Sequence, residues 1–161
     1  MARYHTTIKS ATAIAVDTAF FYLMCPAGQG YNLRRVEAEL RTVGSAGAPP
    51  DQNGVLGISL ATAAGVGAPS ITGTVSPANP NYPADATIAA TSFATTAPTF
   101  GAAAADPWQG AASSRGGIFD NWEMPAEWQV LKGVTQGLVF VNRENALTTP
   151  LAWVLHLEWE V

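Results

Sequence analysis

Charged side chains are scarce in this sequence. Only 12% of its 161 residues are Asp, Glu, Lys or Arg, whereas about 25% is usual for soluble domains. Eight residues are basic and 12 are acidic, so the net charge is -4. Proteins that bind nucleic acid neutralise phosphates with clustered Lys and Arg, and this composition argues against such a partner. A surface with so few charges is poorly solvated, so we expect other chains to cover part of it.

Cysteine and histidine are also nearly absent. Cys25 is the only cysteine, so no disulfide can form within the chain. The two histidines, His5 and His156, lie far apart in the sequence, and the chain contains neither C-x-x-C nor H-E-x-x-H. The sequence therefore predicts no metal site and no cofactor.

Carboxylates and glycines form no recognisable catalytic pattern. Glu123 and Glu127 flank Pro125, which would break any helix that aligned the two carboxylates for glycosidic acid–base chemistry. The Gly-x-Gly pairs at 28–30 and 65–67 lack the later glycine and the helix that cradle a phosphate. We therefore expect that the protein is not an enzyme.

No apolar run is long enough to cross a membrane. The run at residues 11–24 is interrupted by Asp17, and a spanning helix needs about 20 apolar residues. The run is rich in β-forming residues, which predicts one or two strands around a turn at Asp17 and Thr18. Residues 1–9 are expected to form a short strand or an extended arm.

Alternating hydrophobicity is clearest at the C-terminal end. One face of a predicted strand there carries Trp153, Leu155, Leu157, Trp159 and Val161, and the other carries Val154, His156, Glu158 and Glu160. This alternation is typical of a strand half-buried in an antiparallel sheet. Further strands are expected at 55–61, 70–75, 116–122, 128–131 and 138–141. Residues 33–43 fit either a helix or a strand.

Irregular structure is expected in the middle of the chain. Prolines at positions 77, 80 and 83 exclude regular pairing nearby, and residues 87–106 are rich in Ala and Thr. We expect 76–115 to be a long loop or extended excursion lying over its own surface or a neighbour's. Short strands between Gly and Pro turns predict an all-β fold, a single jelly-roll-like antiparallel β-sandwich over 1–161, with an extended N-terminal arm and long irregular loops.

Three stretches and the C-terminal end carry a resemblance to a known family. The stretches are LRRVEAEL at 33–40, LATAAGVG at 60–67 and SPANP at 76–80, and the chain closes on LEWE at 157–160 and then Val161. They resemble small head proteins of tailed bacteriophages, the capsid decoration or cement proteins, although members of that family end in two acidic residues. The resemblance covers residues 32–161, except for the Ala/Thr segment. It implies a jelly-roll-like sandwich in which 33–43 is a strand, and it carries over no catalytic residue.

The resemblance and the composition together predict a structural virion protein. We expect it to bind the lattice of the major capsid protein on the outer surface of the virion, after synthesis in the bacterial cytoplasm, as a homo-oligomer with a trimer favoured. The alternatives are a tail or head–tail connector component, or a carbohydrate-binding sandwich on the virion. Candidate interface residues are Arg3, Tyr4, His5, Phe93, Phe100, Trp108 and Trp122, from the N-terminal segment, the Ala/Thr segment and the tryptophans that border irregular regions.

Overall fold

The computed structural model describes residues 3–24, 31–44, 50–63, 76–77, 90–91, 99–115, 120–123, 129–130 and 137–160. Its elements, in chain order, are β1 (Arg3–Lys9), β2 (Thr18–Met24), β3 (Tyr31–Thr42), β4 (Asn53–Ala63), β5 (Ser76–Pro77), β6 (Ala90–Thr91), β7 (Thr99–Phe100), the 3-10 helix η1 (Ala103–Ala105), β8 (Trp108–Ser113), β9 (Asp120–Glu123), β10 (Gln129–Val130), β11 (Gly137–Glu144) and β12 (Leu151–Glu160). The strand expected at 70–75, both Gly-x-Gly pairs and Phe93 lie outside the described residues.

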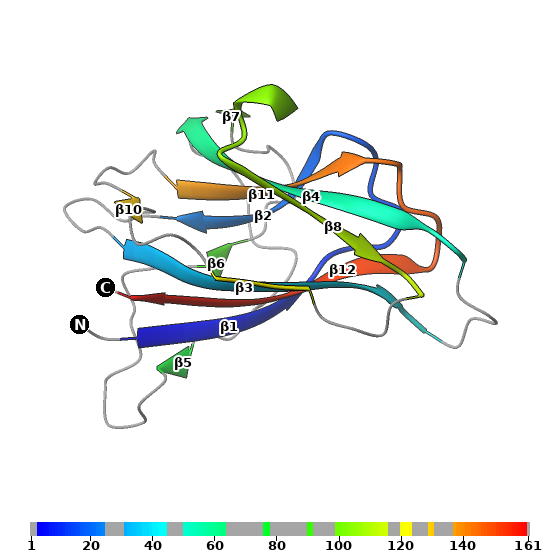
Figure 1. Ribbon diagram of the computed structural model, residues 1–161, viewed down its shortest axis with the longest axis horizontal. Helices are drawn as coiled ribbons and strands as arrows, with labels where there is room; N and C mark the ends of the chain where they lie inside the picture. Colours follow the sequence, from blue (N-terminus) through cyan, green and yellow to red (C-terminus); the bar gives the residue numbers. More distant parts are fainter. Residues whose placement is uncertain are drawn as a thin grey trace.

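The described strands form two antiparallel sheets that face each other (Figure 1). Sheet A has the order β10-β3-β12-β1-β5, and β9 also pairs with β3. Sheet B has the order β6-β2-β11-β4-β7, and β8 also pairs with β4. The first four strands alternate between the sheets, with β1 and β3 in sheet A and β2 and β4 in sheet B, and the last two strands lie in sheet B (β11) and sheet A (β12). The predicted antiparallel β-sandwich is therefore confirmed.

The hydrophobic core lies between the two sheets. Trp153, Leu155, Leu157 and Trp159 of β12 have no exposed surface, which confirms the inward face predicted for these four residues. The ring of Trp153 stacks on Phe20 of β2 at a centroid distance of 6.4 Å. Because one face of each long strand is apolar, closing the two sheets removes that face from water, and this burial is the main favourable contribution to the fold.

The ambiguous segment at 33–43 is a strand. Its inner positions Val36, Ala38 and Leu40 are buried, and the strand hydrogen-bonds to β12 along one edge and to β9 and β10 along the other. A helical stripe over the same residues would have left these backbone groups out of the sheet. The sheet context therefore decides the conformation where sequence periodicity does not.

Two segments for which irregular structure was considered pair within the sheets. Residues 3–9, expected to be a short strand or an extended arm, form the strand, because β1 pairs along its length with β12, from Arg3 opposite Glu160 to Lys9 opposite Val154. Residues 108–113, expected within a long loop, form strand β8 along the edge of β4. Regular pairing forms at 108–113 because each residue there lies opposite a residue of β4 between Asn53 and Ile58, which supplies partners for the backbone groups on that edge.

The run at residues 11–24 contains one strand, not two. Strand β2 starts at Thr18, and a turn at Val16 and Asp17 precedes it. Asp17 has a φ of 53°, which lies in the left-handed region that Asp tolerates better than most residues. The predicted turn is thus present, one residue earlier than expected.

Candidate functional site

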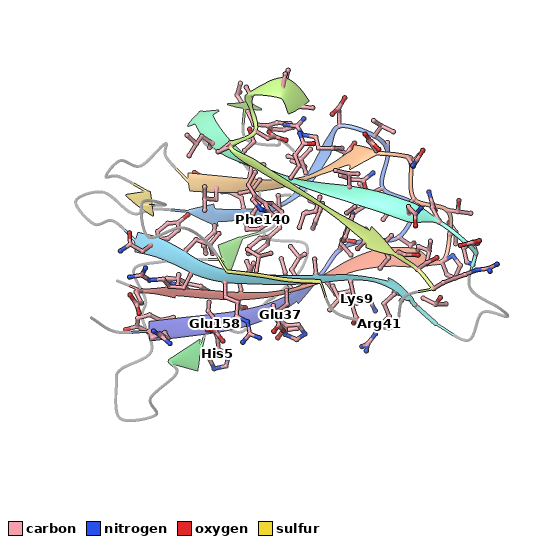
Figure 2. All side chains as sticks on the ribbon, in the orientation of Figure 1. His5, Lys9, Glu37, Arg41, Phe140 and Glu158 are labelled. Atoms are coloured by element: carbon pink, nitrogen blue, oxygen red, sulfur yellow. The ribbon has the colours of Figure 1, made fainter. Side chains whose placement is uncertain are left out.

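Charged side chains gather on the outer face of sheet A. We call this surface the charged face; it consists of Arg3, His5, Thr7 and Lys9 from β1, His156, Glu158 and Glu160 from β12, and Arg34, Arg35, Glu37, Glu39 and Arg41 from β3. Figure 2 shows His5, Lys9, Glu37, Arg41 and Glu158 on this side of the sandwich, whereas Phe140 lies between the sheets. Nine of the chain's 20 Asp, Glu, Lys and Arg residues, including five of the eight basic ones, belong to this face. The scarce charge is therefore concentrated in one place.

The charges of this face are of both signs, and several of them pair across strands. Glu160 lies between two arginines, with one carboxylate oxygen 2.8 Å from Arg3 Nη2 and the other 2.7 Å from Arg34 Nη2. Further along β3, Arg35 contacts both Glu37 of its own strand and Glu158 of β12, and Arg41 Nε lies 3.0 Å from Glu39 Oε1. Exposed pairs of this kind contribute little stability each, but an array of both signs fixes the orientation of a complementary surface.

The arginines on either side of Glu160 affect its ionisation. Hydrogen bonds from Arg3 and then from Arg34 hold the pKa of Glu160 below its ordinary value, although burial acts in the opposite direction. The same contact raises the pKa of Arg3. Because the pKa of Glu160 is lower in the folded state, ionised Glu160 stabilises the fold above the ordinary pKa of 4.5, and this contribution is lost as the pH falls through the lowered pKa.

Replacing Glu160 with Gln is expected to reduce the acid sensitivity of the protein. The variant should lose on the order of 0.5–1 kcal/mol of unfolding free energy at pH 7, and the difference from the native protein should shrink toward pH 3. Urea unfolding at pH 7, 5, 4 and 3 measures this. Glu144→Gln is the matched control, since Glu144 is exposed and belongs to none of the ion pairs among the described residues. If the unfolding free energies of the two variants depended on pH in the same way, the lowered pKa assigned to Glu160 would be contradicted.

The two histidines also belong to the charged face. His156 lies opposite Thr7 in the sheet register, and its Nδ1 shares a hydrogen bond of 2.6 Å with Thr7 Oγ1. His5 is exposed and lies opposite Glu158. The sequence correctly predicts that His156 faces outward, and the pairing of β1 with β12 brings both histidines into the same surface.

The outer face of sheet B has a different chemistry. Its buried cluster consists of Ala19, Tyr22, Ala61, Val139 and Val141, and Phe100 packs against it. At the end of this cluster lies Arg143, whose side chain is 2% exposed and pairs with the fully buried carboxylate of Asp106. Burial lowers the pKa of Arg143, but the hydrogen bonds to Asp106 and Asp17 outweigh that effect and raise it overall. This buried ion pair ties residues 99–107 to the sheet.

Sequence reasoning missed Arg143 and Asp106. One signal was available: the run LVFV at 138–141 is apolar at consecutive positions, which indicates a strand buried on both faces. Arg143 continues that strand, so its side chain needs a buried partner. The sequence does not identify Asp106, 37 residues away, as that partner.

The predicted interface residues divide among several environments. Arg3 and His5 are exposed on the charged face, whereas Tyr4 is only 5% exposed because alternation along β1 points it into the core, where it stacks on Trp159. Tyr4 is therefore a core residue in this structure. Phe100 and Trp108 are half-buried against the protein's own clusters. Trp122 lies on β9 opposite Val36 of β3, and the structure describes its backbone only.

The described residues bring no three His, Cys, Asp or Glu side chains close enough together to hold a metal ion. Glu123 lies on β9, opposite Arg35 of β3, and Glu127 falls outside the described residues. Within the part of the chain that is described, no helix has the length and apolar character needed to span a membrane. The charged face is consequently the candidate site that the geometry offers.

Comparison with known proteins gives no relative: no family model, no curated protein and no solved structure matches this chain.

Proposed function

We propose that this protein is a structural component of a bacteriophage virion that binds the outer surface of the capsid and stabilises the shell. The strand order supports the proposal. Eight strands are arranged as β1-β12-β3-β9 and β2-β11-β4-β8, an order expected of a jelly roll. The sequence resemblance to capsid decoration proteins implies the same fold. Fold alone does not define function, so the proposal also needs a surface that is suited to binding another protein.

The observation that carries the proposal is the difference between the two outer faces of the sandwich. The outer face of sheet B carries an apolar cluster against which the chain's own Phe100 packs. The charged face of sheet A is accessible, with Arg3 and Arg41 exposed by 56% and 61%. It presents both signs of charge along three adjacent strands. A sheet surface with charges of both signs suits contact with another protein surface, because complementary charges fix orientation and exclude wrong partners.

Shell stabilisation follows from mass action. A ligand that binds only the assembled shell lowers the free energy of that state relative to the open one. If the protein forms a symmetric homo-oligomer, with a trimer at each three-fold position of the lattice, the second and third contacts become intramolecular and binding tightens without new interactions. Many modest contacts can then hold the capsid closed.

Co-sedimentation with capsids assembled without this protein tests the proposal. The native protein should bind saturably and at a fixed ratio per capsid hexamer or three-fold site. The double variant Lys9→Glu and Arg41→Glu should bind at least about tenfold more weakly, equivalent to roughly 1.4 kcal/mol, with an unchanged melting temperature.

Arg115→Glu is the matched control, because Arg115 is 71% exposed but lies outside the charged face, paired with Asp51. It should bind like the native protein. Absence of saturable binding would refute the function, and equal weakening by both variants would refute the assignment of the face. A copy number of a dozen or fewer per particle would instead indicate a tail or connector component.

A further inference from the structure

Residues 99–107 cross the outer edge of sheet B as a strap. The strap consists of β7, helix η1 and the link into β8, and it lies at the top of the sandwich in Figure 1, on the side away from sheet A. β7 pairs with Ala61 and Ala63, and β8 pairs with residues 53–58, so both flank the same edge of β4. The strap therefore begins and ends beside the same strand, β4.

One guanidinium group binds the strap at two points, Gly101 and Asp106. Arg143 of β11 donates from Nε to Asp106 Oδ2 at 2.6 Å and from Nη2 to Asp106 Oδ1 at 2.5 Å. Nη2 also donates to the carbonyl of Gly101 at 2.9 Å, and Nη1 donates to Asp17 Oδ1 at 3.1 Å. The guanidinium carbon lies 5.2 Å from the centre of the Phe100 ring. Both ends of the strap are thus fastened at one residue.

The rest of the strap is weakly attached. Helix η1 has no buried residue, and Phe100 is the strap side chain that packs on the apolar cluster of sheet B. Exposed Gln109 of β8 donates to the carbonyl of Ala103 at 2.7 Å and to Asp106 Oδ2 at 3.3 Å. Segments with few buried apolar contacts and exposed backbone open at lower free energy than a core.

Glycine at position 57 makes room for the fastening. A Cβ added to Gly57 of β4 would overlap Asp106 Oδ2 and would lie 2.6 Å from Cγ of Arg143. The closed strap therefore needs glycine at position 57, because any side chain there would occupy the space of the Asp106 and Arg143 side chains. The backbone conformation does not require glycine, since Gly57 lies within a regular strand.

We propose that the strap opens and closes as a unit while the sandwich stays folded, with Arg143 as its catch. When the strap is closed, it hides the Arg143 guanidinium and packs Phe100 on the apolar cluster of sheet B. When it is open, the guanidinium and the position of the Phe100 ring become accessible. The two states therefore differ in whether Arg143 can be reached from solvent, and this inference does not depend on the proposed function.

Hydrogen exchange of the full-length protein tests the proposal. The reporters are the amides of Ala105 and Asp106, which donate to the carbonyls of Ala102 and Ala103 inside the strap, and the amides of β11 and β12, which report on the sandwich. In the native protein the strap amides should exchange at least tenfold faster than those of β11 and β12. Gly57→Ala and Asp106→Asn should each speed strap exchange by a further factor of ten or more.

The control is Asp51→Asn, which removes an exposed carboxylate paired with Arg115 and should leave strap exchange unchanged. Gly57→Ala keeps every charge, so it decides the question if Asp106→Asn fails to fold. Equal exchange rates for strap and sandwich in the native protein would overturn the proposal. It would also be overturned if Gly57→Ala left strap exchange unchanged, or accelerated strap and sandwich alike.

Discussion

Replacing Arg143 with Met is expected to destabilise the protein by about 3–5 kcal/mol, because the substitution leaves the carboxylate of Asp106 buried without its partner. The Asp106 side chain has no exposed surface, and Arg143 is its ion-pair partner. Met matches the aliphatic stem of Arg and keeps the apolar part of the packing, so the loss reports mainly on the unpaired charge. Equilibrium unfolding in urea measures it.

Arg115→Met is the control for this loss. The Arg115–Asp51 pair has a similar distance of 3.1 Å, but its side chains are 71% and 57% exposed, and the expected cost is below about 1 kcal/mol. Similar losses for the two variants would show that the Arg143–Asp106 pair is not effectively buried, and the strap would then lack the catch assigned to it.

Replacing Asn142 with Leu should cost about 3–5 kcal/mol, because several buried polar groups lose their partners at once. Asn142 is fully buried on β11. Its Nδ2 donates to the carbonyls of Ala15 and Asn145, each at 3.1 Å, and its Oδ1 accepts from Trp153 Nε1 at 3.1 Å. The side chain therefore links β11 to β12 and to the turn that precedes β2.

Asn53→Leu is the matched control, since Asn53 is an exposed position on β4 and exposed substitutions usually change stability by less than about 0.5 kcal/mol. Thermal unfolding followed by near-ultraviolet circular dichroism also reports on Trp153, whose environment should change only in Asn142→Leu. If Asn142→Leu unfolded with the same free energy as the control, the buried network would contribute nothing to the fold.

The parts of the fold that sequence predicts are those governed by alternation. The strand at 151–160 is predicted from sequence because Trp153, Leu155, Leu157 and Trp159 fall on one face. Each of them is fully buried in the structure. Such a pattern is a local property of the chain. The same logic correctly places His156 on the outer face.

Long-range pairing sets the limit of that approach. Residues 3–9 read equally as strand or arm until β12, about 150 positions later, supplies the partner for β1. Tyr4 then becomes a core residue, because the register turns it inward. Arg143 and Asp106 are 37 residues apart and belong to no sequence motif. Their contact therefore cannot be predicted from spacing in the sequence.

The shortage of charge does not leave large apolar side chains exposed in the described part of the chain. Among the described residues, Val16 and Leu60 are the only large hydrophobic side chains left exposed. Nine of the 20 charged residues lie together on the outer face of sheet A. This distribution favours one defined contact surface over general stickiness.

Cryo-electron microscopy of capsids saturated with the purified protein tests the central claim most directly. The account predicts density for the sandwich at symmetry-equivalent positions over the outside of the shell, with β1, β12 and β3 turned toward the capsid. Density confined to the tail or the portal vertex, or a sandwich docked with sheet B against the shell, would contradict it.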